Sequence, residues 1–216
     1  MKKTALITGS SKGLGKALAF VFAKNNYDII LQGRDKMDLY NIANEIKTKT
    51  NIVIGDLKQD KTLNELYEVA KKEDISVLVN NAATLCPKLP LEELTDKQIE
   101  DMVSTNLISP IKLTKRIYTL FLKKQEGTII NINSISGLEA QNLRSIYCSS
   151  KSGLRSFTDT LRLESKNKGI NIIGIYPGKV QTKPEHFLGI KAPILAEKIY
   201  ETYKNNLNEL IISDKK

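Results

Sequence analysis

The sequence predicts an α/β protein with three layers, in which a doubly wound parallel sheet of about seven strands carries helices on both faces. Three observations support this fold class. Short apolar runs rich in β-branched residues alternate with longer amphipathic segments, which is typical of strand–helix units in a parallel sheet. A glycine-rich turn joins the first run to the first amphipathic segment. No linker, repeat or low-complexity tract divides the 216 residues, so we expect one domain spanning residues 1–216.

The expected strands are the apolar runs bounded by turn residues: residues 4–8, 28–31, 51–55, 77–80, 127–133, 171–176 and 209–213. The expected helices are the segments with apolar residues three or four positions apart: residues 15–24, 36–47, 61–72, 95–124, 145–168 and 193–204. Asp35 precedes Asp38, and Thr95 precedes Gln98, by the three residues typical of a helix N-cap. These pairs place the starts of the second and fourth helices.

Composition argues against several classes of protein. Hydrophobic residues make up 41% of the chain and charged residues 26%, and no apolar run approaches the ~18 residues that a membrane span requires. Residues 9–13 interrupt the apolar N-terminal run too early for a signal peptide, so we expect a cytoplasmic protein with no membrane segment. The two cysteines, Cys86 and Cys148, belong to no Cys-x-x-Cys or Cys/His cluster, so we expect reduced thiols and no metal site.

The net charge of +9 raises the alternative of a nucleic-acid-binding protein, because lysine and arginine neutralise phosphates. The basic residues are scattered among the helices, however, and lie near acidic or asparagine neighbours. This pattern favours solvated helix faces. We therefore expect no nucleic-acid partner.

The turn after the first strand carries the first functional motif, Thr8-Gly9-Ser10-Ser11-Lys12-Gly13-Leu14-Gly15. A strand-to-helix turn directs free amides and the positive end of the helix dipole at one point, which suits a pyrophosphate. Taken alone, the motif could also be a tight turn without a ligand. Its spacing differs from G-x-G-x-x-G and is similar to the T-G-x-x-x-G-x-G motif of the short-chain dehydrogenase/reductase family. That resemblance implies a Rossmann fold and cofactor binding by Gly9, Ser11, Lys12, Gly13, Leu14 and Gly15.

The end of the second strand indicates which nucleotide is preferred. In a Rossmann fold an acid at this place binds the ribose 2′-hydroxyl of NAD, whereas an arginine accommodates the 2′-phosphate of NADP. Gly33 stands where an NAD-preferring relative would carry the acid, and Arg34 and Lys12 are two cations that could pair with a phosphate. Asp35 is the counter-argument, but N-capping explains it. We expect NADP(H) to be preferred over NAD(H).

Three more segments match the family at the ends of later strands, and the resemblance implies that they bind the cofactor. They are Asp56 and Leu57 after the third strand, Asn80, Asn81 and Ala82 after the fourth, and Pro177, Gly178, Val180 and Thr182 after the sixth. Ala83 replaces the glycine that usually ends the Asn-Asn-Ala-Gly motif. Taken alone, each of these segments could be an ordinary turn.

Tyr147 and Lys151 lie four residues apart, on the same face of an expected helix. A free tyrosine has a pKa of about 10, and a nearby cation can lower the pKa of an acid by about 1–3 units. Such a pair is common on helix surfaces, but Ser134 at the end of the fifth strand and Asn106 occupy the family's other two catalytic positions. The resemblance implies that Ser134 and Tyr147 bind the substrate oxygen and that Tyr147 transfers the proton. It also implies that Lys151 lowers the pKa of Tyr147, that Tyr147 and Lys151 contact the cofactor, and that Asn106 supports a water relay.

The sequence thus predicts an oxidoreductase that transfers a hydride between NADP(H) and a small carbonyl or alcohol substrate. The alternative is a non-catalytic NADP(H)-binding sensor or interaction protein, which would have no chemical need for all four catalytic residues. Residues 183–192 are the expected substrate lid, a short one, and we assign no role to its His186. The resemblance also implies a homodimer or homotetramer formed through the fourth and fifth long helices.

Overall fold

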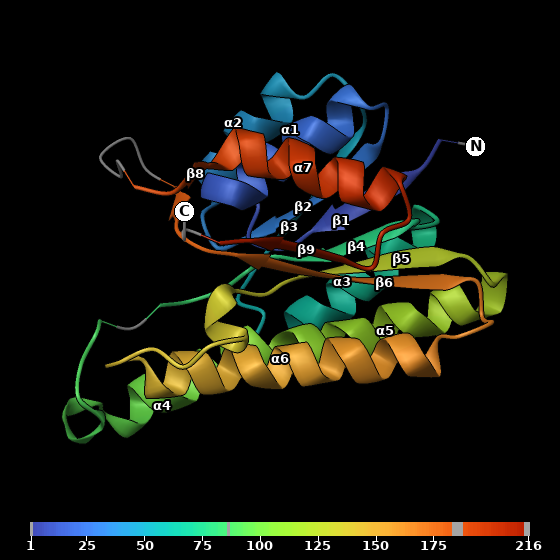
Figure 1. Cartoon of the computed structure of the whole chain (residues 1–216). Helices are drawn as coiled ribbons and strands as arrows, with labels where there is room; N and C mark the ends of the chain where they lie inside the picture. Colours follow the sequence, from blue (N-terminus) through green and yellow to red (C-terminus); the bar gives the residue numbers. More distant parts are fainter. Residues whose placement is uncertain (1, 86, 183–187, 214–216) are drawn as a thin grey trace.

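The computed structural model describes residues 2–85, 87–182 and 188–213, and it has the α/β architecture that the sequence predicts. One parallel sheet runs in the order β3-β2-β1-β4-β5-β6-β9 (Figure 1). Its strands are β1 (Thr4–Ile7), β2 (Asp28–Gly33), β3 (Thr50–Ile54), β4 (Val77–Asn80), β5 (Gly127–Ile132), β6 (Ile170–Pro177) and β9 (Glu209–Ile212). The expected fold class is confirmed.

Helices cover both faces of this sheet. One face carries α1 (Gly13–Lys24), α2 (Lys36–Glu45) and α7 (Ala192–Lys204), and the other carries α3 (Asp60–Lys72), α5 (Ser109–Lys124) and α6 (Ser145–Glu164) (Figure 1). The remaining α-helix, α4 (Asp96–Val103), lies at one end of the molecule. Among the described residues, no helix is both long enough and apolar enough to span a bilayer.

The alternation of side chains along each strand builds two separate cores. In β1, Ala5 and Ile7 belong to the core that packs against α1 and α7, whereas Leu6 belongs to the core that packs against α3 and α5. Every residue of β1, β4 and β5 is buried. Continuous apolar runs are required at these positions because a parallel sheet covered on both faces leaves no strand face to water.

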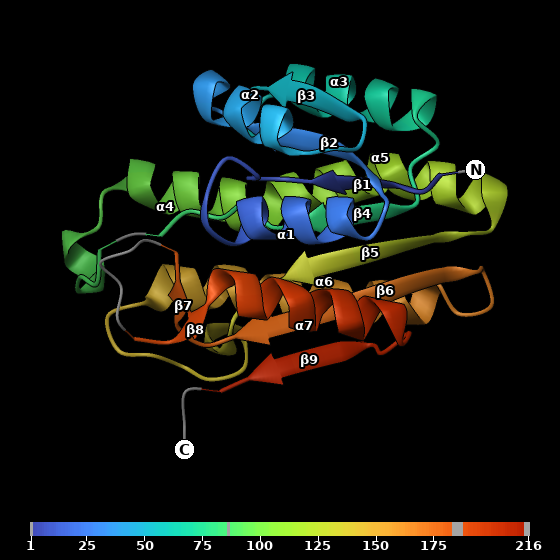
Figure 2. The same ribbon diagram turned by 90° about the horizontal axis from the view of Figure 1, so that it is seen from above.

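The order of the strands places a binding crevice at the carboxyl end of β1. The chain adds β2 and β3 on one side of β1 and then crosses to β4 on the other side. Ligands bind at this switch point in open α/β sheets, because the two diverging connections leave a gap there. The strands point toward the edge at which α4, β7 (Val180–Gln181) and β8 (Ile190–Lys191) lie (Figure 2).

The expected single helix over residues 95–124 is interrupted, which corrects the sequence prediction. The α4 and α5 helices are joined by a π-helical turn, Ser104–Ile108, in which the amide of Ser109 bonds to the carbonyl of Ser104 five residues back. Pro110 is the physical reason. It has no N–H to donate to the carbonyl of Asn106, four residues back, and its ring crowds that carbonyl.

Both predicted helix caps are present. The Asp35 carboxylate accepts the amide of Asp38 at 3.0 Å. Thr95 and Gln98 form a capping box, in which the amide of Gln98 donates to Oγ1 of Thr95 and the amide of Thr95 donates to Oε1 of Gln98. These caps satisfy amides that the first turn of α2 and of α4 would otherwise leave without partners.

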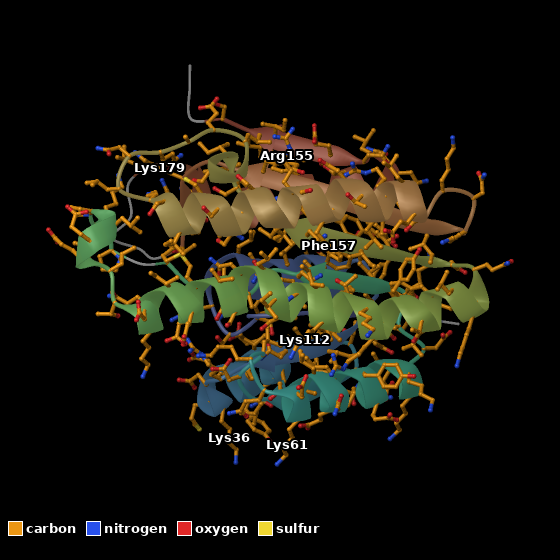
Figure 3. All side chains as sticks on the ribbon, turned by 90° about the horizontal axis from the view of Figure 1, so that it is seen from below. Lys36, Lys61, Lys112, Arg155, Phe157 and Lys179 are labelled. Carbon is orange, nitrogen blue, oxygen red and sulfur yellow. The ribbon has the colours of Figure 1, made fainter. Side chains whose placement is uncertain are left out.

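The basic side chains are spread over several elements of the structure. Figure 3 labels five of them, Lys36 on α2, Lys61 on α3, Lys112 on α5, Arg155 on α6 and Lys179 after β6. Some of them pair with acids, as Lys112 does with Asp60 at 3.5 Å and Arg155 with Asp159 at 3.7 Å. This distribution matches solvated helix faces, and the absence of a nucleic-acid partner stays a prediction.

Candidate active site

The glycine turn between β1 and α1 forms an open cradle of backbone amides. Gly9 and Gly13 have φ angles of +64° and +55°, which glycine adopts without steric cost. The α1 helix starts at Gly13 with no side-chain cap from Lys12 and no acidic residue in its first turn. Its first amides and the positive end of its dipole are therefore available to an anion, and the turn fits the pyrophosphate of a dinucleotide.

Gly15 keeps this cradle compact. A Cβ atom at Gly15 would lie 2.2 Å from the carbonyl oxygen of Gly9 and 2.6 Å from Nδ2 of Asn81. Any side chain there would push α1 away from the turn. Leu14, between the two glycines, is buried and belongs to the core under the turn.

Hydrogen bonds connect the end of β1 to the end of β4. Oγ1 of Thr8 accepts the amides of Asn81 and Ala82, at 2.9 and 3.1 Å, and donates to the carbonyl of Val79 at 3.3 Å. Nδ2 of Asn81 donates to the carbonyl of Thr8 at 2.9 Å. A Cβ at Gly9 would lie 2.9 Å from Cα of Ala82. The glycine turn and the segment after β4 therefore form one wall of the crevice.

Asn80 has a different environment from its two neighbours in sequence. It is buried, and its Nδ2 donates to Oγ1 of Thr114 at 2.9 Å and to Oδ1 of Asn131 at 2.8 Å. These bonds connect β4 to β5 and α5. In its described contacts, Asn80 therefore connects the elements beneath the crevice, whereas Asn81 and Ala82 form part of the crevice wall.

Gln32 is a structural residue of the site that the sequence analysis missed. It is buried at the end of β2, where its Oε1 accepts the amide of Gly9 at 3.0 Å and its Nε2 donates to the carbonyl of Gly55 at 2.9 Å. Ser10 completes the contact, because its Oγ accepts the amide of Gln32 at 2.9 Å. A polar residue at the end of an apolar strand was the available signal.

The candidate 2′-phosphate site lies beside Gly33. Arg34 and Lys12 are both exposed, and neither forms a salt bridge with any residue that the structure describes. A Cβ at Gly33 would lie 3.4 Å from Oγ of Ser11, so the end of β2 directly abuts the glycine turn. The carboxylate of Asp35 is engaged in its N-cap.

Asp56 and Leu57 lie at the end of β3. Oδ1 of Asp56 accepts the amide of Lys58 at 2.9 Å, and Oδ2 lies 3.7 Å from Nζ of Lys58. Asp56 therefore has the contacts of an ordinary turn residue, which is the alternative that its sequence context left open. Leu57 is buried in the core beside α3.

The segment after β6 closes the other end of the glycine turn. Pro177 ends β6, and the amide of Gly178 donates to the carbonyl of Ile212 in β9 at 2.8 Å. Val180 pairs with Ile190 across β7 and β8, a short ladder that the sequence did not predict. A Cβ at Gly13 would lie 3.1 Å from Cβ of Thr182. Residues 183–187 of the expected lid, including His186, lie outside the described residues.

Ser134 and Tyr147 meet at the carboxyl edge of the sheet. Ser134 follows β5, is 7% exposed, and its Oγ accepts the amide of Ser136 at 3.1 Å. Tyr147 comes from the first turn of α6, and its side chain is hydrogen-bonded to Ser134. Burial raises the pKa of the Tyr147 phenol above its usual value, whereas the bond to Ser134 and the positive charge of Arg144 lower it. The sequence predicted a lowered pKa for Tyr147, but desolvation is the larger effect.

Lys151 lies one helical turn beyond Tyr147 and is 2% exposed. Its Nζ donates to the carbonyl of Ile132 at 2.9 Å and lies 6.0 Å from the centre of the Tyr147 ring. Burial lowers the pKa of Lys151 to about 8. A cation is therefore held close to the tyrosine, at a desolvation cost that the single carbonyl offsets only in part.

Asn106 lies in the π-helical turn and is 1% exposed. Its Oδ1 accepts the amide of Thr84 at 2.8 Å, and its Nδ2 donates to the carbonyl of Thr84 at 3.0 Å and to Oγ of Ser150 at 3.4 Å. The side chain thus connects the segment after β4 to α6, next to Lys151. The expected water relay through Asn106 stays a prediction.

A pocket that is partly open to solvent lies beside Tyr147. The residues that line it are Leu85, Pro87, Leu94, Met102, Leu143, Arg144, Ser145, Ile146 and Tyr147. Most of this lining is apolar, and among the described lining residues Arg144 alone carries a charge.

The burial of Lys151 predicts how stability depends on pH. Because its pKa is about 8 in the folded protein and about 10.5 in the unfolded chain, the unfolded state binds more protons between these values. The contribution of Lys151 to the free energy of unfolding should therefore rise by about 2–3 kcal/mol as the pH increases from 8 to 10.5.

Denaturant unfolding of the wild type and of Lys151→Met at pH 7.5 and pH 10 measures this contribution. The wild type should gain stability relative to the variant at the higher pH, because all other titrating groups are common to both proteins. A difference that stays constant with pH would show that Lys151 has an ordinary pKa.

Together, the glycine turn, the crevice and the pocket are typical of a dinucleotide-binding enzyme of the α/β class. A family model described as short chain dehydrogenase matches residues 3–189. The NADP-dependent 3-hydroxy acid dehydrogenase of Schizosaccharomyces pombe is 37% identical over 191 residues, which cover 84% of this chain and 73% of that protein. The chain belongs to the short-chain dehydrogenase/reductase family, and it is an oxidoreductase that acts on carbonyl or alcohol groups with a nicotinamide nucleotide.

Solved structures share the fold of this chain. A short-chain dehydrogenase from Sphingobium yanoikuyae in complex with NADPH superposes with a TM-score of 0.89 at 23% identity, covering 97% of this chain and 87% of that one. ElxO with NADP bound gives a TM-score of 0.87 at 27% identity, covering 98% and 96%. The chain spans between 61% and 73% of the length of five curated relatives that are 29% to 37% identical to it.

Proposed function

We propose that this protein is an NADP(H)-dependent oxidoreductase that interconverts a carbonyl and an alcohol, with Tyr147 as its acid and base. The observation that carries the proposal is the placement of Tyr147. Its hydroxyl is bonded to Ser134, it lies one turn from a buried cation, and it borders a largely apolar pocket at the carboxyl edge of the sheet. The strands of that sheet extend from Thr4 to Ile212, which supports one dinucleotide-binding domain over residues 1–216.

A nicotinamide nucleotide held by the glycine turn would supply the hydride. In the direction of reduction, Tyr147 donates its proton to the substrate oxygen while Ser134 holds that oxygen by a hydrogen bond. The C=O double bond becomes a C–O single bond, the carbon gains a C–H bond from the hydride, and the oxygen gains an O–H bond from the Tyr147 proton. The tyrosine must then recover a proton. Burial keeps the phenol protonated near pH 7, which is the state that a proton donor requires.

Lys151 and Asn106 support the tyrosine in different ways. The ammonium of Lys151 stabilises the phenolate that forms when Tyr147 loses its proton, because opposite charges attract strongly at a site shielded from water. Asn106 holds the segment after β4 against α6 through Thr84 and Ser150. It therefore maintains the spacing between the cofactor side and the catalytic side of the crevice.

The preference for NADP(H) rests on Lys12 and Arg34 and on the lack of an acid at Gly33. The name of the Schizosaccharomyces pombe relative specifies NADP dependence and a 3-hydroxy acid, and the ElxO structure contains NADP. We propose that the glycine turn holds the pyrophosphate and that the two exposed cations hold the 2′-phosphate.

A panel of substrates tests the proposal. Purified protein is mixed with NADPH or NADH and with aldehydes, ketones, and 3-oxo acids and their esters, and the loss of reduced-nucleotide absorbance is followed. Turnover of at least one carbonyl compound, faster with NADPH, is expected. Tight NADPH binding with no turnover of any carbonyl or alcohol would instead support the non-catalytic sensor.

The way in which copies of the chain associate stays a prediction, as does a cytoplasmic location. The α5 and α6 helices lie side by side on one face, and Figure 3 labels Phe157 between them. Leu122 and Leu163 on these helices are 39% and 76% exposed. This face is the one through which the family resemblance implies a homodimer or homotetramer.

A further inference from the structure

Arg144 is a charged residue inside the pocket that the proposed chemistry does not use. It immediately precedes α6 and lines the pocket beside Tyr147, and its guanidinium carbon lies 5.6 Å from the centre of the Tyr147 ring. The described lining around it is otherwise uncharged. A group bound to Tyr147 in this pocket would therefore lie within reach of one positive charge.

One nitrogen of the Arg144 guanidinium lacks a hydrogen-bond partner in the part of the chain that the structure describes. This nitrogen, Nε, is fully buried. Three other arginines each pair with an aspartate, namely Arg116 with Asp60, and Arg155 and Arg162 with Asp159. A buried donor without an acceptor is costly, so a site of this kind favours a ligand that supplies the missing acceptor.

The start of α6 adds a second positive influence at the same place. This helix of 20 residues has no side-chain cap at Arg144 and no acidic residue in its first turn. Ser145 and Ile146, the first two residues of α6, also line the pocket. The free amides and the helix dipole therefore favour a negative charge on the side of the pocket where Arg144 lies.

We propose that Arg144 determines substrate specificity by binding a carboxylate, so that the protein acts on short oxo acids and hydroxy acids in preference to neutral ketones and alcohols. The planar guanidinium matches a carboxylate with two parallel hydrogen bonds. This inference rests on the proposed function, because it places the reacting carbonyl at Tyr147.

The distance from Arg144 to Tyr147 limits where the acid group is located. The guanidinium carbon lies 5.6 Å from the centre of the Tyr147 ring. A substrate carboxylate bound to Arg144 must therefore be within a few bonds of the carbon that reacts at Tyr147. In an acyl group bound to a carrier, the phosphate of the carrier arm is separated from the reacting carbonyl by many bonds. Such a phosphate does not meet this requirement. A small free acid fits better than a carrier-bound acyl group.

The test compares an acid with its neutral ester. The ratio of kcat/KM for 3-oxobutanoate to that for its methyl ester is measured with NADPH in the wild type and in Arg144→Gln, Arg144→Lys and Arg155→Gln. The glutamine variant should lower the ratio by about 10- to 100-fold, as expected for loss of a hydrogen-bonded charge pair. The ratio for Arg144→Lys should lie between those of the wild type and Arg144→Gln, because lysine keeps the positive charge but cannot form two parallel hydrogen bonds to a carboxylate.

Arg155→Gln is the matched control, because it removes an arginine from within α6 (Figure 3), at a site that is not among the residues lining the pocket. It should leave the ratio unchanged. If Arg144→Gln reduces activity toward the acid and the ester equally, Arg144 acts on Tyr147 or on folding, and the inference is wrong. A wild type that prefers the ester would overturn it as well.

A binding measurement separates this inference from the proposed function. Calorimetric titration of the protein with butanoate and with butanamide, in the presence of NADP⁺, requires no turnover. Butanoate should bind at least 10-fold more weakly to Arg144→Gln than to the wild type, with no such change for butanamide. Equal binding of butanoate to both proteins contradicts the inference even if carbonyl compounds are reduced.

Discussion

Tyr147→Phe should lower kcat with any carbonyl substrate by about 10²- to 10⁴-fold, the usual contribution of a positioned acid or base. The substitution removes only the hydroxyl that is bonded to Ser134 and keeps the ring that packs beside Lys151 and Arg144. Affinity for NADPH, measured by fluorescence titration, should change little. The loss should therefore appear in kcat and not in cofactor binding.

The matched control for this variant is Tyr118→Phe. The hydroxyl of Tyr118 pairs with Oγ of Ser165 at 3.0 Å, between α5 and the end of α6, and so lies outside the pocket lining. It should leave kcat unchanged. Full activity in Tyr147→Phe would refute the assignment of Tyr147, whatever the substrate.

Gly33→Asp should reverse the cofactor preference, changing the ratio of kcat/KM for NADPH to that for NADH by about 10³-fold. The space beside Gly33 admits a Cβ, since the nearest atoms, in Ser11 and Leu39, would lie 3.4 Å away. The new carboxylate would repel a 2′-phosphate, a contact between like charges that costs several kcal/mol. It could instead accept the 2′-hydroxyl of NADH.

Arg34→Ala tests the same site from the other side. Removing this exposed cation should weaken NADPH binding about 10-fold, the low end for a charge-assisted hydrogen bond, and leave NADH binding unchanged. Arg155→Ala serves as the control, since that arginine lies on α6 (Figure 3) and not beside the end of β2, where the 2′-phosphate is expected. A wild type that clearly prefers NADH, or an Arg34→Ala variant that loses both nucleotides equally, would contradict the assignment.

Local rules account for the parts of the fold that the sequence predicted. Each buried strand is an apolar run, and the caps at Asp35 and Thr95 depend on side chains only three residues from the amides that they bind. The glycine turn is similarly local, because Gly9 and Gly13 need positive φ angles. Information that lies within a few residues can be extracted from the chain without its three-dimensional structure.

The structure differs from the sequence prediction at the π-helical turn, and it adds the contacts of Gln32, which depend on residues far apart in the chain. The π-helical turn had a local signal in Pro110, which the regular apolar spacing of residues 95–124 concealed. Gln32 had only a weak signal, because its partners Gly9 and Gly55 are each 23 residues away. No local pattern indicates which backbone groups a buried amide will reach.

The sequence by itself determined the strand and helix order, the glycine turn after β1 and the spacing of Tyr147 and Lys151, because these follow from periodicity and from glycine positions along the chain. Only the tertiary structure decided the electrostatics of the site. Burial raises the pKa of Tyr147, lowers that of Lys151 to about 8, and leaves Nε of Arg144 without a partner in the pocket. Desolvation depends on every atom packed around a group, and those atoms come from segments far apart in the chain.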